Sequence, residues 1–483
     1  MKKQWTIAIC LLLISILVRL PFYFVDVVNW DESTFILMGQ SLLDGHLPYT
    51  ELWDIKPPVA FAAYALFILL LGKSIIAIRI AGTLCVFLTA WFIYILGKRI
   101  SNSNAGIFAA ITSIVGLTTI RGGQSTMTEH VAVVLLAGAL AWLTTRKLNV
   151  KVLFIGGILF TLAALVRLNL AFVVVAVGFW LVYGKFKYKN PNFQGIIVYC
   201  LGSFGTIFLS YIPYLITDNS SIWFDSVVLA PLSYSGSEGH SETYKILPAL
   251  LCFVILNLLW RKVSDQQQRE FSLLQVTLLG IVISIILGGE FHQHYYLQGF
   301  PFLALTLALY WSKLPSRIGR LIIVAIATFF LVTELNPVYA KYGELGDRLK
   351  AGKPLQHGTA YEIVDYLEQN NPERQPVYMM KDHIIYWLTD FEPLSKIATH
   401  PSNLGKEYLY EYVMGATDSM EAELTRILAQ KPMFIVKREE EKFIDENPPI
   451  KQILEQTLAT EYELTERIGD REIYRRRFSR SQL

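Results

Sequence analysis

The stretch WDESTFILMGQ (residues 30–40) places two carboxylates, Asp31 and Glu32, directly after the first long apolar run of the chain. Residues 33–44 carry apolar side chains at helical spacing and end at Asp44, which predicts a helix lying in the membrane interface. The two carboxylates stand at or just before the start of this helix, where the helix dipole favours negative charge. Because neighbouring residues on a helix point about 100° apart, only one of them can easily face a common pocket.

Long apolar runs dominate the rest of the sequence. Of its 483 residues, 53% are hydrophobic, and the mean hydropathy is +0.40. A helix needs roughly 20 mostly apolar residues to cross a bilayer. Eleven runs approach that length: 5–25, 75–97, 104–120, 130–145, 152–166, 168–183, 194–216, 246–260, 271–288, 295–312 and 318–335. We therefore expect a polytopic α-helical membrane protein with about 11 transmembrane helices.

The basic residues predict the orientation of these spans, because lysine and arginine collect on cytoplasmic loops. Six basic clusters fall on one side of the predicted bundle: Lys2-Lys3, Lys98-Arg99, Arg146-Lys147-Lys151, Lys185-Lys187-Lys189, Arg261-Lys262-Arg269 and Lys313-Arg317-Arg320. The N-terminus is then cytoplasmic and the C-terminus lies outside. By the same rule, residues 59–71 are predicted to form an interfacial helix rather than a span. The stretch 152–183 is predicted to be two spans with a break near Arg167.

The chain beyond about residue 336 has a different character: it is charged, rich in turns and without a spanning run. Short β-type segments alternate with amphipathic helical segments, which predicts a small α/β domain on the outer face. The expected strands are 376–381, 434–437 and a hairpin around Gly469-Asp470, and the expected helices are 360–369 and 420–430. The predicted domains are residues 1–335 in the membrane and 336–483 outside it.

Charge and cysteine content exclude other classes. A net charge of +3 gives no argument for a nucleic-acid partner. The four cysteines (Cys10, Cys85, Cys200 and Cys252) lie within apolar runs and lack metal-ligand spacing, so we expect neither a disulfide nor a cysteine metal site.

Ionisable side chains gather on the predicted outer loops, although a charge at bilayer depth costs roughly 2.5–3.5 kcal/mol. In ELWDIKPPVAF (51–61), Lys56 precedes two prolines and is held at the mouth of the helix that they begin, a good position for binding an anion. The alternative is a lysine that snorkels to the interface. Asp54 could pair with Lys56 or be solvated.

Two further outer turns carry reactive side chains. RGGQSTMTEHVAV (121–133) contains Arg121, a phosphate ligand or a rim arginine, and Glu129 and His130, where helix capping is the alternative to a site. EFHQHYY (290–296) offers the set His292, His294 and Tyr295 for substrate contact or interfacial packing. Metal binding by the two histidines is the other alternative: only two ligands lie in reach, and side chains two residues apart diverge on a helix, so chelation would require an extended backbone.

Taken together, these motifs resemble those of the GT-C glycosyltransferases, in particular bacterial members of the protein O-mannosyltransferase and aminoarabinose-transferase superfamily. The residues that carry the resemblance are Asp31-Glu32, Leu47-Pro48-Tyr49, Lys56-Pro57-Pro58, Glu129 and His292-Gln293-His294-Tyr295-Tyr296. The likeness covers about residues 1–335. It implies a GT-C fold and inverting transfer of a sugar from a polyprenyl-phosphate donor, at the outer face of the membrane, to a lipid, glycan or protein acceptor.

The resemblance also implies roles for individual residues. Asp31 corresponds to the base or acceptor-positioning carboxylate, Lys56 to the lysine that contacts the donor phosphate, and Glu129 to an assisting acidic residue. Arg121 and Arg167 are further candidates for the phosphate. The supporting residues would be Glu32, Tyr49, Asp54, His130, His292, His294 and Tyr295. No cofactor is required, although some relatives bind a divalent metal near the first-loop carboxylates.

Physical chemistry agrees with these roles. A lipid phosphate leaves readily once cations offset its charge, and Asp31 at a low-dielectric rim could have the raised pKa that suits a base. Two alternatives remain open: a polyprenyl-linked glycan ligase or polymerase, and a lipid or glycan transporter. Transporters usually carry inverted repeats and place their ionisable groups at mid-membrane, and neither feature is evident here. We expect a multi-pass protein of the plasma (inner) membrane, with its C-terminal domain periplasmic or extracellular.

Overall fold

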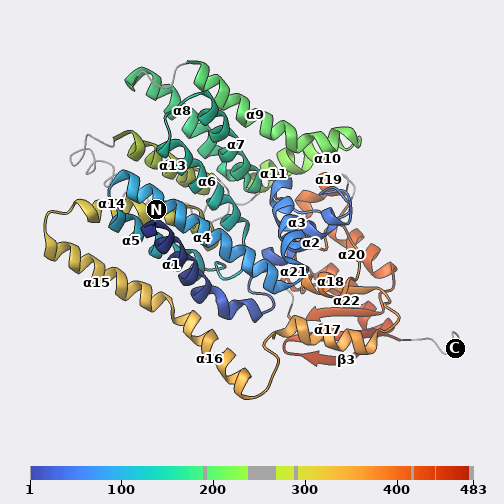
Figure 1. Cartoon of the computed structure of the whole chain (residues 1–483). Helices are drawn as coiled ribbons and strands as arrows, with labels where there is room; N and C mark the ends of the chain where they lie inside the picture. The colour runs from blue at the N-terminus through green and yellow to red at the C-terminus, as the bar shows by residue number, and fades with distance from the viewer. Residues whose placement is uncertain are drawn as a thin grey trace.

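The computed structural model describes residues 2–188, 193–237, 268–287, 292–414, 418–440 and 442–477. A bundle of long helices forms one side of the molecule, and a small sheet with its covering helices forms the other (Figure 1).

The bundle is built mainly from the first 350 residues. Its helices are α1 (Lys2–Arg19), η1 (Leu20–Phe24), α2 (Trp30–Leu43), α3 (Pro58–Leu71), α4 (Ile75–Ile100), α5 (Ser103–Thr119), α6 (Thr128–Thr145), α7 (Val150–Val166), η2 (Leu168–Leu170), α8 (Ala171–Tyr188), α9 (Phe193–Ile216), α10 (Ser220–Phe224), η3 (Asp225–Leu229), α11 (Ala230–Ser237), α13 (Gln268–Ile286), η5 (Gln293–Tyr295), α14 (Tyr296–Lys313), α15 (Arg317–Glu334) and α16 (Asn336–Lys350). A helix covers each predicted span except 246–260, which lies outside the described residues.

Among the described helices, six are long and apolar enough to cross a membrane, and there are seven if the pair α15 and α16, bent by 41°, is one span. Helices α5 and α7 are apolar but shorter, at 17 residues each. The polytopic membrane fold is therefore confirmed, while the count of eleven spans stays a prediction. The expected break at Arg167 is present, because α7 ends at Val166 and α8 begins at Ala171.

Helix α15 stands apart from the bundle. It runs along the outside of the other helices and continues into α16, which leads toward the sheet (Figure 1). None of its residues is buried, as expected for a helix whose apolar side chains face lipid.

The first outer loop folds into the two short helices expected from its sequence. Helix α2 begins one turn earlier than predicted, so Asp31 and Glu32 lie in its first turn. Helix α3 starts at Pro58 with Pro57 as its N-cap, because a proline fits the first helical position without losing a hydrogen bond. Its 14 residues are too few to cross a bilayer.

The C-terminal part is an α/β unit, as predicted. Its elements are α17 (Thr359–Asn370), β1 (Val377–Met379), α18 (Ile384–Thr389), η6 (Asn403–Gly405), η7 (Glu407–Leu409), α19 (Tyr410–Val413), α20 (Met420–Ala429), β2 (Phe434–Arg438), α21 (Lys442–Asp445), α22 (Pro448–Glu461), β3 (Tyr462–Ile468) and β4 (Arg471–Arg476). The strand order is β1-β2-β4-β3. β1 runs parallel to β2, and the other two pairs are antiparallel, with Tyr378 facing Ile435 and Ile435 facing Tyr474.

This unit packs directly on the first outer loop. Helix α18 lies against α2, and Trp387 donates a hydrogen bond to Gln40 at 3.2 Å. The backbone amide of Trp53 donates to the Lys396 carbonyl at 2.8 Å. One continuous hydrophobic core joins buried residues of both parts, including Phe35 and Ile385. The C-terminal unit is therefore in contact with the loop that carries the predicted site.

Candidate functional site

The first turn of α2 positions the two neighbouring carboxylates. The side-chain oxygen of Asn29 accepts a hydrogen bond from the backbone amide of Asp31 at 2.9 Å, and this cap fixes where the helix begins. The carboxylates then diverge, since Glu32 is buried whereas 25% of the Asp31 side chain is exposed. The sequence-based expectation that the pair is not equivalent is confirmed.

Glu32 points into the bundle and meets Arg79 of α4. Nε and Nη2 of Arg79 lie 2.8 Å and 2.6 Å from the two oxygens of Glu32, and the Thr126 amide donates to the same carboxylate. Arg79 also donates to the backbone carbonyls of Phe22 and Asp26. Glu32 thus ties α2 to α4 and to the loop before α6, which is a structural role beside the site.

Asp31 points the other way and lies between two histidines. Its Oδ1 is 3.2 Å from Nε2 of His400, and its Oδ2 is 3.9 Å from Nε2 of His294. His294 precedes α14 and belongs to the residues predicted from the sequence. His400 belongs to the C-terminal unit and was not predicted.

The ionisation of Asp31 differs from the sequence-based expectation. Burial by itself would raise the pKa of this carboxyl. The hydrogen bond and charge of His400, together with the charges of Lys56 and His294, more than offset burial and hold the pKa of Asp31 well below its usual range. The expected raised pKa is therefore wrong: Asp31 is a carboxylate at neutral pH, and the lowered pKa makes it a weaker base than an unperturbed aspartate.

Lys56 is presented by a tightly bonded turn. Its backbone amide donates to Asp54 Oδ1 at 3.1 Å, and the hydroxyl of Tyr49 donates to its carbonyl at 2.6 Å. Tyr49 and Asp54 are both buried, so both predicted supporting residues hold the backbone of Lys56 and leave its ammonium group to reach outward. Its Nζ is paired with no carboxylate of the described residues within 4.0 Å.

A second group of predicted residues converges at the end of α7. Nη1 of Arg167 lies 2.6 Å from Glu129 Oε1 and donates to Thr128 Oγ1 at 3.0 Å. The Arg167 guanidinium stacks on Tyr295, 4.9 Å from the ring centroid, and His294 Nε2 lies 3.6 Å from Glu129. Glu129 therefore neutralises Arg167 and links it, through His294, to Asp31.

Both groups meet at one cavity of about 240 Å³. Its polar lining includes Lys56, Arg167 and Asn169, and its apolar lining includes Phe172 and Leu287, with other residues of the turn at 55–57, of η2 and of α11. A cavity lined by both cations and apolar side chains suits an amphiphilic anion such as a lipid phosphate.

Of the predicted site residues, Lys56, Arg167 and Tyr295 line this cavity. Three of the others, Arg121, His130 and His292, also lie outside the contacts between Asp31, His294, Glu129 and Arg167. Arg121 is exposed beside Gly122 and is not part of the cavity lining. His130 is fully buried, with Nδ1 accepting from the Met127 amide and Nε2 within 2.9 Å of the Leu117 carbonyl. It therefore holds the α5–α6 connection and does not reach substrate. His292 stacks on His294 at 5.3 Å between ring centroids and supports it from the exposed side.

The described residues do not fit the divalent metal that the family resemblance allowed. No group of three His, Cys, Asp or Glu side chains within the described ranges could hold a metal ion. Glu32, the neighbour of Asp31, is already engaged by Arg79 and a backbone amide. No step of the chemistry below is therefore assigned to a metal.

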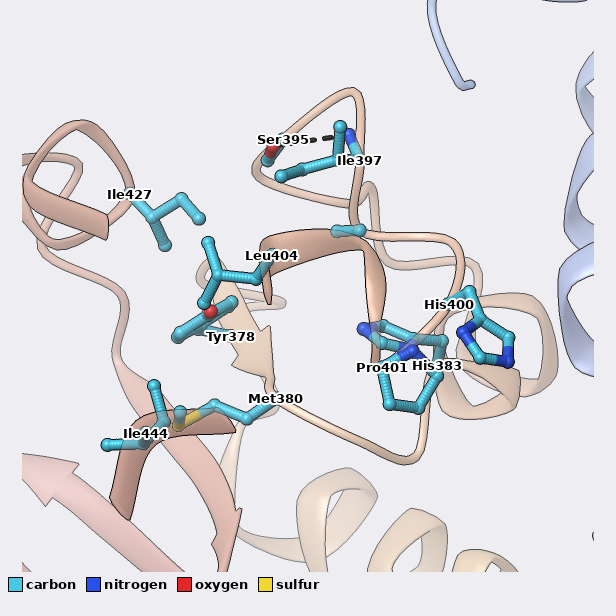
Figure 2. A pocket seen from close by; sticks show the side chains of 11 residues that line it. Tyr378, Met380, His383, Ser395, Ile397, His400, Pro401, Leu404, Ile427 and Ile444 are labelled. Atoms are coloured by element: carbon cyan, nitrogen blue, oxygen red, sulfur yellow. Dashed lines mark hydrogen bonds between the residues drawn. The ribbon is translucent and has the colours of Figure 1, made fainter. Parts of the chain in front are cut away.

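The residue that sequence reasoning missed is His400. It follows a buried segment of the C-terminal unit and lies beside His383 and Pro401 at a small cavity of about 30 Å³ (Figure 2). A histidine more than 360 residues away from Asp31 gives no local sequence signal, because only the fold brings the two together.

Comparisons with known proteins show which sequences and folds this chain is similar to. The sequence of residues 55–215, about a third of the chain, matches the family described as dolichyl-phosphate-mannose-protein mannosyltransferase. A comparison of the whole sequence with curated proteins gives no match.

Solved structures match over nearly the whole chain. ArnT from Cupriavidus metallidurans bound to undecaprenyl phosphate is 13% identical, with a TM-score of 0.63 over 98% of this chain and 97% of that one. Its apo state gives 12% identity and 0.62 over 95% of both chains. The oligosaccharyltransferase AglB from Archaeoglobus fulgidus, in complex with an inhibitory peptide and a dolichol-phosphate, gives 12% identity and 0.55, over 99% of this chain and 74% of that one.

These likenesses establish the fold. The protein is a multi-pass membrane protein with the GT-C fold of membrane glycosyltransferases, and its small C-terminal sheet is part of the similarity to ArnT, which extends over 98% of the chain.

Proposed function

We propose that the protein is an inverting glycosyltransferase that moves a sugar from a polyprenyl-phosphate donor to an acceptor at the outer face of the membrane. The observation that carries the proposal is one ionised carboxylate, Asp31, under the influence of the charge of Lys56, which lines a cavity together with Arg167. The shared fold with ArnT, which was solved bound to undecaprenyl phosphate, supports the choice of a lipid-phosphate donor.

The two cations that line the cavity, Lys56 and Arg167, would bind the donor phosphate. Arg167 is already compensated by Glu129 at 2.6 Å, so Lys56 supplies the net positive charge there. An ammonium group near the first turn of α3 stabilises a phosphate in the ground state and still more as it leaves with the full negative charge. The apolar side chains of the same cavity, such as Phe172 and Leu287, would contact the first part of the lipid chain.

Asp31 would act as the base. The acceptor hydroxyl or amine attacks the anomeric carbon, and the bond from that carbon to the phosphate oxygen breaks. The electron pair of that bond leaves with the phosphate, and the acceptor proton passes to the free oxygen of Asp31. Attack from the face opposite the phosphate inverts the anomeric configuration in one step, without a covalent intermediate on the enzyme.

The position of Glu129 gives it an indirect role. It is fully buried and holds Arg167 and His294 within 3.6 Å of its Oε1. It would keep these two side chains in the orientations in which they face the cavity and Asp31, and so it acts as a positioning residue. This refines the assisting role that the family resemblance implied for it.

The proposal is tested with membranes that contain the full-length protein. They are incubated with radiolabelled sugars linked to synthetic undecaprenyl phosphate, and both the release of undecaprenyl phosphate and the transfer of label are measured. Wild type is compared with Asp31→Asn, Lys56→Met and the control His46→Gln, which changes an exposed residue of the same loop. Donor-dependent transfer that is lost in the first two variants supports the proposal. Label that crosses the membrane on an unchanged donor would instead indicate transport.

A further inference from the structure

His400 reaches the site from the C-terminal unit in a fixed position. Two hydrogen bonds tie its segment to the first outer loop: Thr34 Oγ1 donates to the Thr399 carbonyl at 2.8 Å, and Thr399 Oγ1 donates to the Trp53 carbonyl at 2.7 Å. Asn403 donates to Thr399 Oγ1 at 3.0 Å from the other side. Thr34, Thr399 and Asn403 are all at least nine-tenths buried, so the backbone on both sides of His400 is held.

The ring of His400 is also oriented. The backbone amide of Ser402 donates to Nδ1 at 3.2 Å. Since a backbone amide can only donate, and the Ser402 hydroxyl 2.8 Å from Nδ1 can donate as well, these contacts fit the tautomer in which Nδ1 accepts and Nε2 carries the proton. Nε2 is the atom that lies 3.2 Å from Asp31 Oδ1. The ring therefore places a nitrogen that can carry a proton within hydrogen-bond distance of the carboxylate.

We propose that His400 is the positioning residue for Asp31, so that the C-terminal unit completes the catalytic site by donating a hydrogen bond from Nε2 to Oδ1. This rests on the proposed function in one respect, that Asp31 is the base. The bond occupies one carboxylate oxygen and leaves Oδ2, which lies beyond hydrogen-bond distance of His294 at 3.9 Å, as the oxygen that receives the acceptor proton.

The other charged groups around Asp31 show which interaction of its carboxylate depends on His400 alone. Lys56 and His294 face it from the first outer loop and from η5. Glu129 and Arg167 lie next to His294 and form an ion pair with each other, so their charges compensate. The neighbouring charges of Glu32 and Arg79 are paired with each other. His400 is the one side chain among these described groups that is within hydrogen-bond distance of the Asp31 carboxylate, so its removal leaves a partly buried carboxylate with more distant charges only.

His400 does not extend the site into a proton relay. The next titratable group behind it is His383, which is 4% exposed and lies beside Pro401 (Figure 2). Burial, with a further contribution from His400, lowers the pKa of His383 to about 3, so it does not take up a proton at neutral pH. Nδ1 of His400 is occupied by the Ser402 amide. His400 therefore has no partner behind it to which it could pass a proton.

The test measures the protonation of Asp31 without using transferase activity. Full-length protein in membranes is treated across a pH series with dicyclohexylcarbodiimide, which modifies protonated carboxyl groups, and labelling of Asp31 is measured by peptide mass spectrometry. The variants are His400→Ala, which removes the donor, and His400→Gln, whose amide nitrogen can donate from nearly the same place. His46→Gln is the matched histidine control, and Asp31→Asn gives the background.

At each pH above the pKa of Asp31, the labelling rate follows the small protonated fraction, so it should rise about tenfold or more in His400→Ala for a pKa rise of about one unit or more. It should stay unchanged in His46→Gln and lie between wild type and His400→Ala in His400→Gln. An unchanged labelling rate in His400→Ala would overturn the proposal. An increase in His400→Gln as large as in His400→Ala would overturn it as well, because a donor would then not be what matters. Gel filtration of each variant in detergent checks folding.

Transfer activity provides the second readout. If His400 positions the base, kcat should fall in His400→Ala while the KM for the donor stays near that of wild type, and His400→Gln should restore most of kcat. If Asp31→Asn transfers sugar at the wild-type rate, the proposed function of Asp31 fails while the labelling result stands. If labelling is insensitive to His400 but Asp31→Asn is inactive, only the role of His400 fails.

Discussion

The buried ion pair between Glu32 and Arg79 gives a quantitative prediction for Arg79→Met. Arg79 is fully buried and makes two contacts to the Glu32 carboxylate, of 2.6 Å and 2.8 Å, as well as hydrogen bonds to the carbonyls of Phe22 and Asp26. The substitution leaves a buried carboxylate with the Thr126 amide as its remaining donor. Removing one partner of such a pair costs about 3–5 kcal/mol of folding stability.

The assay is unfolding of the detergent-solubilised protein, followed by tryptophan fluorescence. Arg99→Met is the matched control, because Arg99 is half exposed and its contact to Glu270 is 3.4 Å long, so it should cost at most about 1 kcal/mol. The double variant Glu32→Gln with Arg79→Met should recover part of the loss, since neither charge is then stranded. A loss for Arg79→Met no larger than that for Arg99→Met would refute the reasoning.

Three other predictions concern the site and its support. Lys56→Met should weaken binding of the undecaprenyl-phosphate donor about 10- to 100-fold, since a charged hydrogen bond contributes roughly 1.5–3 kcal/mol. The KM for the donor measures this change, and an unchanged KM would contradict the prediction. Thr399→Val should lower the free energy of unfolding by about 1–3 kcal/mol in the same assay, because buried hydrogen bonds to Trp53 and from Asn403 are lost. An unfolding midpoint equal to that of wild type would contradict this prediction. Asp390→Asn removes the charge of the exposed pair with Lys73 and should change the free energy of unfolding by less than about 1 kcal/mol. A larger change would contradict the prediction.

Much of the membrane part could be predicted from the sequence because its signals are local. Apolar run length marks the spans, proline marks the start of α3, and the excess of basic residues on one side marks the break at Arg167. The turn that presents Lys56 follows from the two prolines after it. These features depend on residues that are close in the chain, and the structure contains them.

The rest depends on contacts between distant segments. In the sequence, Arg79 is an isolated charge within an apolar span. Only the fold, which brings α4 next to Glu32 of α2, shows that the two charges form a pair. The pKa of Asp31 was predicted with the wrong sign because burial could be inferred from the sequence, whereas the hydrogen bond from His400 could not. His130 was placed in the site because it adjoins Glu129, although it points to the backbone at Leu117.

The measurement that tests the central claim most directly is sugar transfer by Asp31→Asn. Membranes with equal amounts of wild-type, Asp31→Asn and His46→Gln protein are incubated with the same radiolabelled undecaprenyl-phosphate sugar, and transferred label is counted. A positioned general base contributes about 100- to 10,000-fold to a rate, so Asp31→Asn should transfer at least about 100-fold more slowly than the other two. Transfer by a well-expressed Asp31→Asn protein at the wild-type rate would contradict the account.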